Sequence, residues 1–123
     1  MFSQFEQLEM LDLSGNQIDV LGNDSFADLT SLKQLYLGEN HVHQIEPYAF
    51  TNASVQVLIL ESNRLTEIGK SMFRGARLLQ QLSLKNNQVL LYSFPLVLYC
   101  YGWKFENYDK GQDSKTKKFP WKI

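Results

Sequence analysis

The hydrophobic residues of this chain follow one spacing that recurs along most of its length. Leucines stand three and then two residues apart, and an asparagine comes three residues after the last of them. This L-x-x-L-x-L-x-x-N pattern occurs four times, with a valine opening the third copy: Leu8, Leu11, Leu13 and Asn16; Leu32, Leu35, Leu37 and Asn40; Val55, Leu58, Leu60 and Asn63; Leu79, Leu82, Leu84 and Asn87. The asparagines are separated by 24, 23 and 24 residues, which predicts a stack of similar short coils.

Further hydrophobic columns follow each asparagine at constant offsets. Aliphatic residues stand two and five positions later, as the pairs Ile18 and Leu21, Val42 and Ile45, and Leu65 and Ile68. A phenylalanine stands ten positions later, as Phe26, Phe50 and Phe73. Phe2 precedes Leu8 by six residues, where the same column would fall. We therefore expect the chain to begin inside a repeat.

The L-x-L segment of each copy predicts a short strand, since alternate side chains of a strand point to opposite faces. The paired leucines would face a common core, and the residues between them would face outward. An asparagine after the strand can bond backbone groups that would otherwise be buried unpaired. Stacked copies would then form an asparagine ladder, and the phenylalanines would close the opposite wall of each coil.

With these four copies the chain resembles the leucine-rich repeat family, over about residues 2–89. It is most similar to the roughly 24-residue type with one phenylalanine per repeat, common in extracellular and receptor ectodomains. The resemblance implies an α/β fold: a right-handed solenoid, or horseshoe, with a concave parallel sheet of short strands and an irregular or short-helical convex side. It also implies a protein-binding module for recognition, adhesion or receptor signalling. We expect the repeat array over 1–88 and a non-repeat tail over 89–123.

The outward positions of the predicted strands form the candidate binding face. They make three columns: Met10, Gln34, Val57 and Gln81; Asp12, Tyr36, Ile59 and Ser83; Ser14, Gly38, Glu61 and Lys85. Tyr36, Val57 and Ile59 would be neighbours, and tyrosine is a frequent interface anchor. The alternative is that these three residues are there because they suit strands.

Charge narrows the class of partner. The chain carries 12 basic and 13 acidic residues, and the predicted face mixes Asp12 and Glu61 with Lys85. No continuous basic stripe is present for a phosphate backbone to follow. We expect a protein ligand or receptor partner and no nucleic acid.

Catalytic and metal chemistry receive little support from the sequence. His41 and His43 lie near Glu39 and Glu46, but they flank the inward Val42 at positions that are variable in the other copies. The repeat places no third and fourth ligand beside them. No nucleophile motif or glycine-rich phosphate loop occurs. We therefore expect no metal, no cofactor and no enzyme activity.

The sequence has features that favour two different cellular locations. Two sequons, Asn23-Asp24-Ser25 and Asn52-Ala53-Ser54, are possible glycosylation sites in a secreted protein. The family resemblance favours an extracellular or cell-surface location. The first ten residues lack a secretory signal, and a single Cys100 cannot make an intramolecular disulfide. These features favour a cytoplasmic scaffold or regulator, or a fragment of a longer protein.

The tail changes character after the last repeat. Residues 89–103 are uncharged and apolar but include Pro95, and six lysines follow in 104–123. The tail can be read as a cap over the last coil, as a membrane-associated anchor through 89–103, or as a segment unrelated to this fold. The resemblance leads us to expect cysteines in a cap, which this tail does not match beyond Cys100. Uncapped ends would also permit self-association and lower stability.

Overall fold

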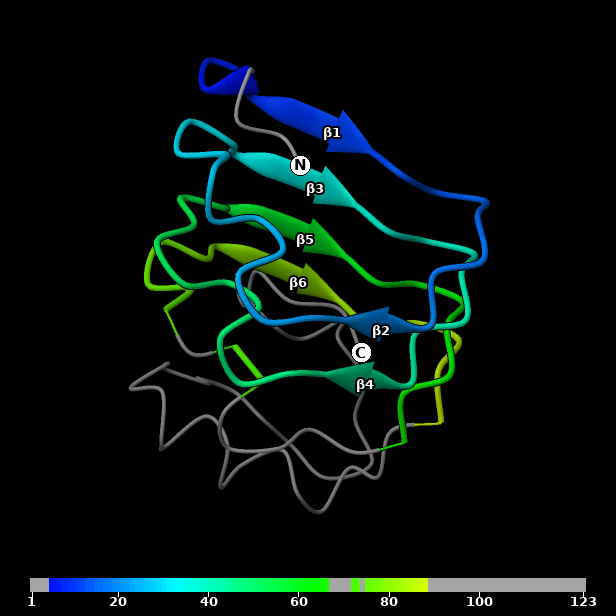
Figure 1. Ribbon diagram of the computed structural model, residues 1–123. Helices are drawn as coiled ribbons and strands as arrows, with labels where there is room; N and C mark the ends of the chain where they lie inside the picture. The colour runs from blue at the N-terminus through cyan, green and yellow to red at the C-terminus, as the bar shows by residue number, and fades with distance from the viewer. Residues whose placement is uncertain (1–4, 67–71, 74, 89–123) are drawn as a thin grey trace, which may run out of the picture.

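The computed structural model describes residues 5–66, 72–73 and 75–88. Within these residues the chain winds through successive stacked coils, and one strand from each coil joins a parallel sheet in the order β1-β3-β5-β6 (Figure 1). These four strands are β1 (Met10–Asp12), β3 (Gln34–Tyr36), β5 (Val57–Ile59) and β6 (Gln81–Ser83). A second, two-stranded parallel sheet pairs β2 (Val20–Leu21) with β4 (Gln44–Ile45). The predicted leucine-rich repeat solenoid is confirmed, with an irregular side opposite the main sheet.

The register of the main sheet follows the leucine columns. Leu11 pairs with Leu35, Leu35 with Leu58, and Leu58 with Leu82. The last three of these leucines are fully buried, whereas Leu11, on the first strand, is only partly buried. The predicted alignment of the repeats as adjacent rungs is therefore confirmed.

The asparagines form the predicted ladder between coils. The amide nitrogen of Asn63 donates to the carbonyl oxygens of Leu37, Leu60 and Glu61 at 2.9, 3.1 and 3.2 Å. Its Oδ1 accepts from the backbone N–H of Val42 in the preceding coil at 2.9 Å. Each of Asn40, Asn63 and Asn87 thus bonds its own turn and the coil before it.

The residue before each ladder asparagine has a left-handed backbone. The φ angles at these four positions are +73°, +54°, +58° and +58°, for Gly15, Glu39, Ser62 and Asn86. This conformation turns the chain out of the strand within one residue, which brings the following asparagine under the carbonyls of its own coil. Only the first copy uses glycine there, so the other turns carry a backbone strain that the ladder and the core must offset.

The phenylalanine column fills the wall opposite the main sheet. Phe50 is fully buried between the rings of Phe26 and Phe73. Its ring centroid lies 5.8 Å from that of Phe26 and 6.1 Å from that of Phe73, with interplanar angles of 13° and 27°. Consecutive coils are therefore joined by two sets of contacts, leucines behind the sheet and stacked rings on the far side.

Gly75 occupies a turn that only glycine fits. Its φ is +90°, and a Cβ added there would lie 2.9 Å from the carbonyl oxygen of Phe50 and 3.2 Å from the Cα of Thr51. We expect Gly75→Ala to lower the free energy of unfolding by about 2–4 kcal/mol, because backbone strain adds to the clash. Gly15→Ala is the matched control, since φ there is +73° but no atom lies within 4 Å, and we expect about 1–2 kcal/mol. Equal losses in urea denaturation of the two variants would show that the contact with Phe50 is unimportant.

Candidate protein-binding surface on the concave sheet

The register brings the predicted display residues together as rows on one face of the main sheet. One row follows Met10, Gln34, Val57 and Gln81, and the next follows Asp12, Tyr36, Ile59 and Ser83. The third row, just beyond the strands, is Ser14, Gly38, Glu61 and Lys85. Backbone hydrogen bonds keep this row aligned. In each, the N–H of the residue that follows one row member donates to the carbonyl of the next row member: Gly15 to Gly38, Glu39 to Glu61 and Ser62 to Lys85. We call these three rows the concave face.

The centre of the concave face is apolar. Tyr36, Val57 and Ile59 lie on the paired strands β3 and β5, and their side chains are partly exposed. The hydroxyl of Tyr36 donates to Oε1 of Gln34 at 2.7 Å. The phenol therefore has a hydrogen-bond partner on its own strand, which orders the ring without a ligand. A partly exposed, ordered tyrosine beside two aliphatic side chains has the composition of an interface anchor.

The two ends of the concave face differ. Met10 is 53% exposed on β1, whereas Ser83, which the sequence places on the displayed face, is fully buried on β6. The Ser83 hydroxyl donates to Oε1 of Glu61 at 2.5 Å. Ser83 therefore positions the Glu61 carboxylate, which lies just beyond the neighbouring strand β5, and does not itself present a surface to a ligand.

Asp12 is held in its charged form by its own turn. Hydrogen bonds from the Ser14 side chain, and then from the Ser14 backbone N–H, lower the pKa of the Asp12 carboxyl below its ordinary value. The backbone contact spans 2.9 Å. A depressed folded pKa favours the native turn above the unfolded pKa, and this preference is lost as the pH falls through the folded pKa.

Replacing the hydroxyl tests this account of Asp12. We expect Ser14→Ala to raise the Asp12 pKa toward its ordinary value, because the largest lowering interaction is removed while the backbone N–H stays. The measurement is an NMR titration of the Asp12 side-chain carbon. Ser25→Ala is the control, since Ser25 donates instead to the Gly22 carbonyl at 2.6 Å. An Asp12 pKa equal in the wild type and Ser14→Ala would contradict the assignment.

The charges of the concave face are few and of both signs. Asp12 and Glu61 are acidic, Lys85 is basic, and the Lys33–Glu9 ion pair at 3.3 Å lies exposed beside the strands. An exposed pair of this kind contributes little to stability. The arrangement fits a partner that is recognised by apolar contact with a few polar bonds around it.

The other sequence candidates lie away from this face. His41 is partly exposed and His43 exposed, and within the described ranges no three histidine, cysteine, aspartate or glutamate side chains gather as metal ligands. Asn23 and Asn52 are both exposed. The suggested anchor over 89–103, Cys100 and the lysines of the tail lie outside the described residues. No helix in the part of the chain that the structure describes is long and apolar enough to cross a membrane.

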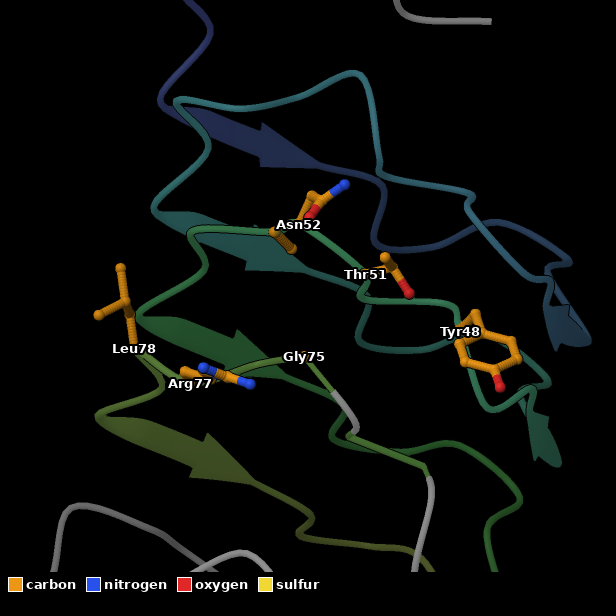
Figure 2. A pocket seen from close by; sticks show the side chains of 7 residues that line it. Tyr48, Thr51, Asn52, Gly75, Arg77 and Leu78 are labelled. Atoms are coloured by element: carbon orange, nitrogen blue, oxygen red, sulfur yellow. The ribbon is translucent and has the colours of Figure 1, made fainter.

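One surface feature was not predicted from the sequence. A shallow hollow of about 560 Å³ lies away from the concave face, lined by Tyr48, Thr51, Asn52, Ala53, Gly75, Arg77 and Leu78 (Figure 2). Tyr48 is 48% and Leu78 54% exposed. The sequence feature that could have indicated this hollow is a pair of hydrophobic residues at repeat positions that are polar in the other copies. Tyr48 stands where the neighbouring copies have Asp24 and Ser71, and Leu78 where the others have Gln7, Ser31 and Ser54.

The sequence matches the family model described as leucine rich repeat over residues 1–42 and 36–89. It is 40% identical over 88 residues to human leucine-rich repeats and immunoglobulin-like domains protein 3, a match covering 70% of this chain and 8% of that protein. It is 35% identical over 94 residues to bovine asporin, covering 72% of this chain and 25% of asporin. Each relative is thus much longer than this chain.

Solved structures show the same architecture. A complex of TLR13 with the single-stranded RNA ssRNA13 matches with a TM-score of 0.69 and 34% identity, over 72% of this chain and 13% of the other. A structure of the LRIM1/APL1C complex matches with a TM-score of 0.63 and 32% identity, over 72% of this chain and 17% of the other. The repeat register, the family model and these relatives show that the chain belongs to the leucine-rich repeat family.

Proposed function

We propose that this chain is a protein-binding module of a cell-surface or extracellular recognition or adhesion protein, and that it engages its ligand through the concave face. The observation that carries the proposal is the apolar centre formed by Tyr36, Val57 and Ile59 on adjacent strands. Tyrosine is one of the residue types that dominate the energetics of protein interfaces, and the contacts around such an anchor contribute by excluding water. Polar residues around them, Gln34, Glu61 and Gln81 among them, would form the rim.

The comparisons support a protein-interaction role and a cell-surface or extracellular setting. One human relative combines leucine-rich repeats with immunoglobulin-like domains, and domains of that type are frequent on cell surfaces. The LRIM1/APL1C structure is a complex named for its two components. The TLR13 structure contains RNA, but the concave face here offers one lysine against two carboxylates. The charge therefore favours a protein ligand over a phosphate backbone for this chain.

The test is a binding screen with matched variants. The chain, clustered on beads to gain avidity, would be screened against an array of purified cell-surface ectodomains. We expect Tyr36→Ala combined with Ile59→Ala to weaken the captured interaction at least tenfold, since loss of two anchors removes about 2–4 kcal/mol of binding free energy. Circular dichroism would verify that the variant is folded.

The control variant replaces one tyrosine and one aliphatic residue outside the concave face. Tyr48→Ala combined with Leu78→Ser alters an exposed tyrosine and an exposed leucine that lie outside the concave face, and we expect unchanged affinity. If the concave variant binds as well as the wild type, the concave face is not the interface. If the control variant alone loses binding, the hollow is the interface instead.

A further inference from the structure

The middle row of the concave face has a carboxylate on each side of its apolar centre. Asp12, Tyr36, Ile59 and Ser83 follow one another across the strands β1, β3, β5 and β6 (Figure 1). Ser83 is fully buried, and its hydroxyl donates to Oε1 of Glu61 at 2.5 Å. The Glu61 carboxylate therefore lies at the end of the row that Ser83 would otherwise occupy. Across the sheet the row presents an acid, a tyrosine, an isoleucine and a second acid.

We propose that the ligand segment which crosses this row is an extended polypeptide with a basic residue at each end and a hydrophobic residue midway between them. This inference rests on the proposed function, that the concave face binds a protein, and adds the kind of sequence that is recognised. The two basic side chains would pair with Asp12 and Glu61. The hydrophobic side chain would contact Tyr36 and Ile59.

The spacing of the strands sets the spacing of the ligand residues. Neighbouring strands lie about 4.8 Å apart, so the two ends of a row across four strands are separated by about 14 Å. An extended segment rises about 3.3 Å per residue, and its alternate side chains point to the same face. Its positions i, i+2 and i+4 therefore face one way and span about 13 Å. The complementary pattern is basic-x-hydrophobic-x-basic.

Glu61 supplies the stronger of the two charged contacts. Its side chain is only partly exposed, and within the described residues it forms no ion pair, with the exposed Lys85 of the third row or with any other cation. The Ser83 hydroxyl fills one of about four lone-pair sites of the carboxylate and leaves the others free to accept. Because this carboxylate is already held in place and partly removed from water, it gains more from a cation than a mobile, solvated one does. A guanidinium can bond both oxygens at once, so arginine is favoured over lysine.

Asp12 supplies the weaker contact. It is exposed on β1, and the side chain and backbone N–H of Ser14 already donate to its carboxylate. An exposed ion pair contributes little to affinity. We therefore expect the Glu61 end of the row to contribute more to binding than the Asp12 end.

The experiment uses peptides of defined sequence on beads. The full 123-residue chain, clustered on streptavidin to gain avidity, would be titrated onto beads that carry Thr-Arg-Thr-Leu-Thr-Arg-Thr. Matched beads carry citrulline in place of both arginines, or the shorter Thr-Arg-Leu-Arg-Thr, which turns leucine away from the two arginines. We expect binding to be about tenfold weaker on both matched beads, because each loses the charge or the spacing that fits the row. Raising the salt concentration should narrow the difference between the arginine and citrulline beads.

Carboxamide variants identify which carboxylates pair with the peptide. On the arginine beads, Glu61→Gln should weaken binding about tenfold and Asp12→Asn about two- to threefold. Asp19→Asn is the matched control, because it removes one exposed carboxylate outside the three rows, and we expect unchanged binding. Equal binding to arginine and citrulline beads, or binding that survives Glu61→Gln, would overturn the inference.

Ser83 is tested as a positioning residue that acts through Glu61. Ser83→Ala should weaken binding about threefold in the wild type and have no effect in Glu61→Gln. A residue that only stabilised the sheet would weaken both backgrounds alike, and that outcome would overturn the role assigned to Ser83. Circular dichroism would verify that each variant is folded.

The proposed function is judged separately by the array of ectodomains, which offers ligands of every sequence pattern. An array ligand that needs Tyr36 and Ile59 but neither carboxylate would refute the basic-hydrophobic-basic segment and keep the concave face as the interface. Peptide binding that needs Glu61, together with an array ligand unaffected by Tyr36→Ala and Ile59→Ala, would do the opposite. The two failures are therefore distinguishable.

Discussion

Phe50→Ala is expected to lower the free energy of unfolding by about 4–8 kcal/mol. Deleting a buried phenylalanine costs about 3–5 kcal/mol through lost burial and the cavity left behind. Phe50 is fully buried and stacks on both Phe26 and Phe73, and each such ring pair adds about 0.5–1.5 kcal/mol. A small domain has a total stability of about 5–15 kcal/mol. The variant should therefore be largely unfolded at moderate denaturant, which circular dichroism during urea titration would measure.

Two further substitutions separate the stack from a general loss of hydrophobicity. Phe50→Leu keeps most of the volume and should cost roughly 1–2 kcal/mol. Phe5→Ala removes a ring that is 43% exposed and should cost less than about 1 kcal/mol. If Phe50→Ala were no more damaging than Phe5→Ala, the phenylalanine column would not be what joins the coils.

The sequence predicted the core well because every structural requirement recurs. An inward leucine, a ladder asparagine or a stacked phenylalanine must appear at the same offset in each coil. The printed sequence therefore repeats the same constraint several times. The Leu35–Leu58 pairing and the Asn63 hydrogen bonds confirm those offsets residue by residue.

The turn before each asparagine could not be predicted in the same way. Glu39, Ser62 and Asn86 share a left-handed φ but no side-chain chemistry. The conformation is imposed by the coil as a whole, through the bonds from the following asparagine to the carbonyls of the turn. A column without a common residue type leaves no pattern to read.

The sequence predicted which side chains lie on the concave face, but only partly how exposed each of them is. Alternation along the strands placed Tyr36 and Ile59 on the concave face, but the burial of Ser83 depends on its surroundings in three dimensions. The hollow beside Asn52 is likewise built by two consecutive coils, one supplying Tyr48 and the other Leu78. Contacts between coils at variable positions are set by unrepeated residues, so the repeat pattern does not encode them.

Asn63→Ala should destabilise the chain by about 3–5 kcal/mol. One buried N–H left unpaired costs about 1–3 kcal/mol, and each further lost hydrogen bond costs about 0.5–1.5 kcal/mol even though the carbonyls of Leu37, Leu60 and Glu61 each keep a second donor. The asparagine is buried, and its loss leaves the N–H of Val42 without the Oδ1 acceptor at 2.9 Å. The carbonyl oxygens of Leu60 and Glu61 lose a donor each in the same step. We expect unfolding at lower urea concentration, together with faster hydrogen exchange at the Val42 amide.

The matched control is the first rung of the same ladder. Asn16 is exposed, and its amide nitrogen bonds only carbonyls of its own turn, Leu13 at 2.8 Å and Ser14 at 3.4 Å. Asn16→Ala should therefore cost about 1 kcal/mol and leave exchange at Val42 unchanged. The difference between the two variants isolates what an asparagine contributes by bonding two coils at once. Losses of equal size would mean that the ladder stabilises single turns and does not hold neighbouring coils together.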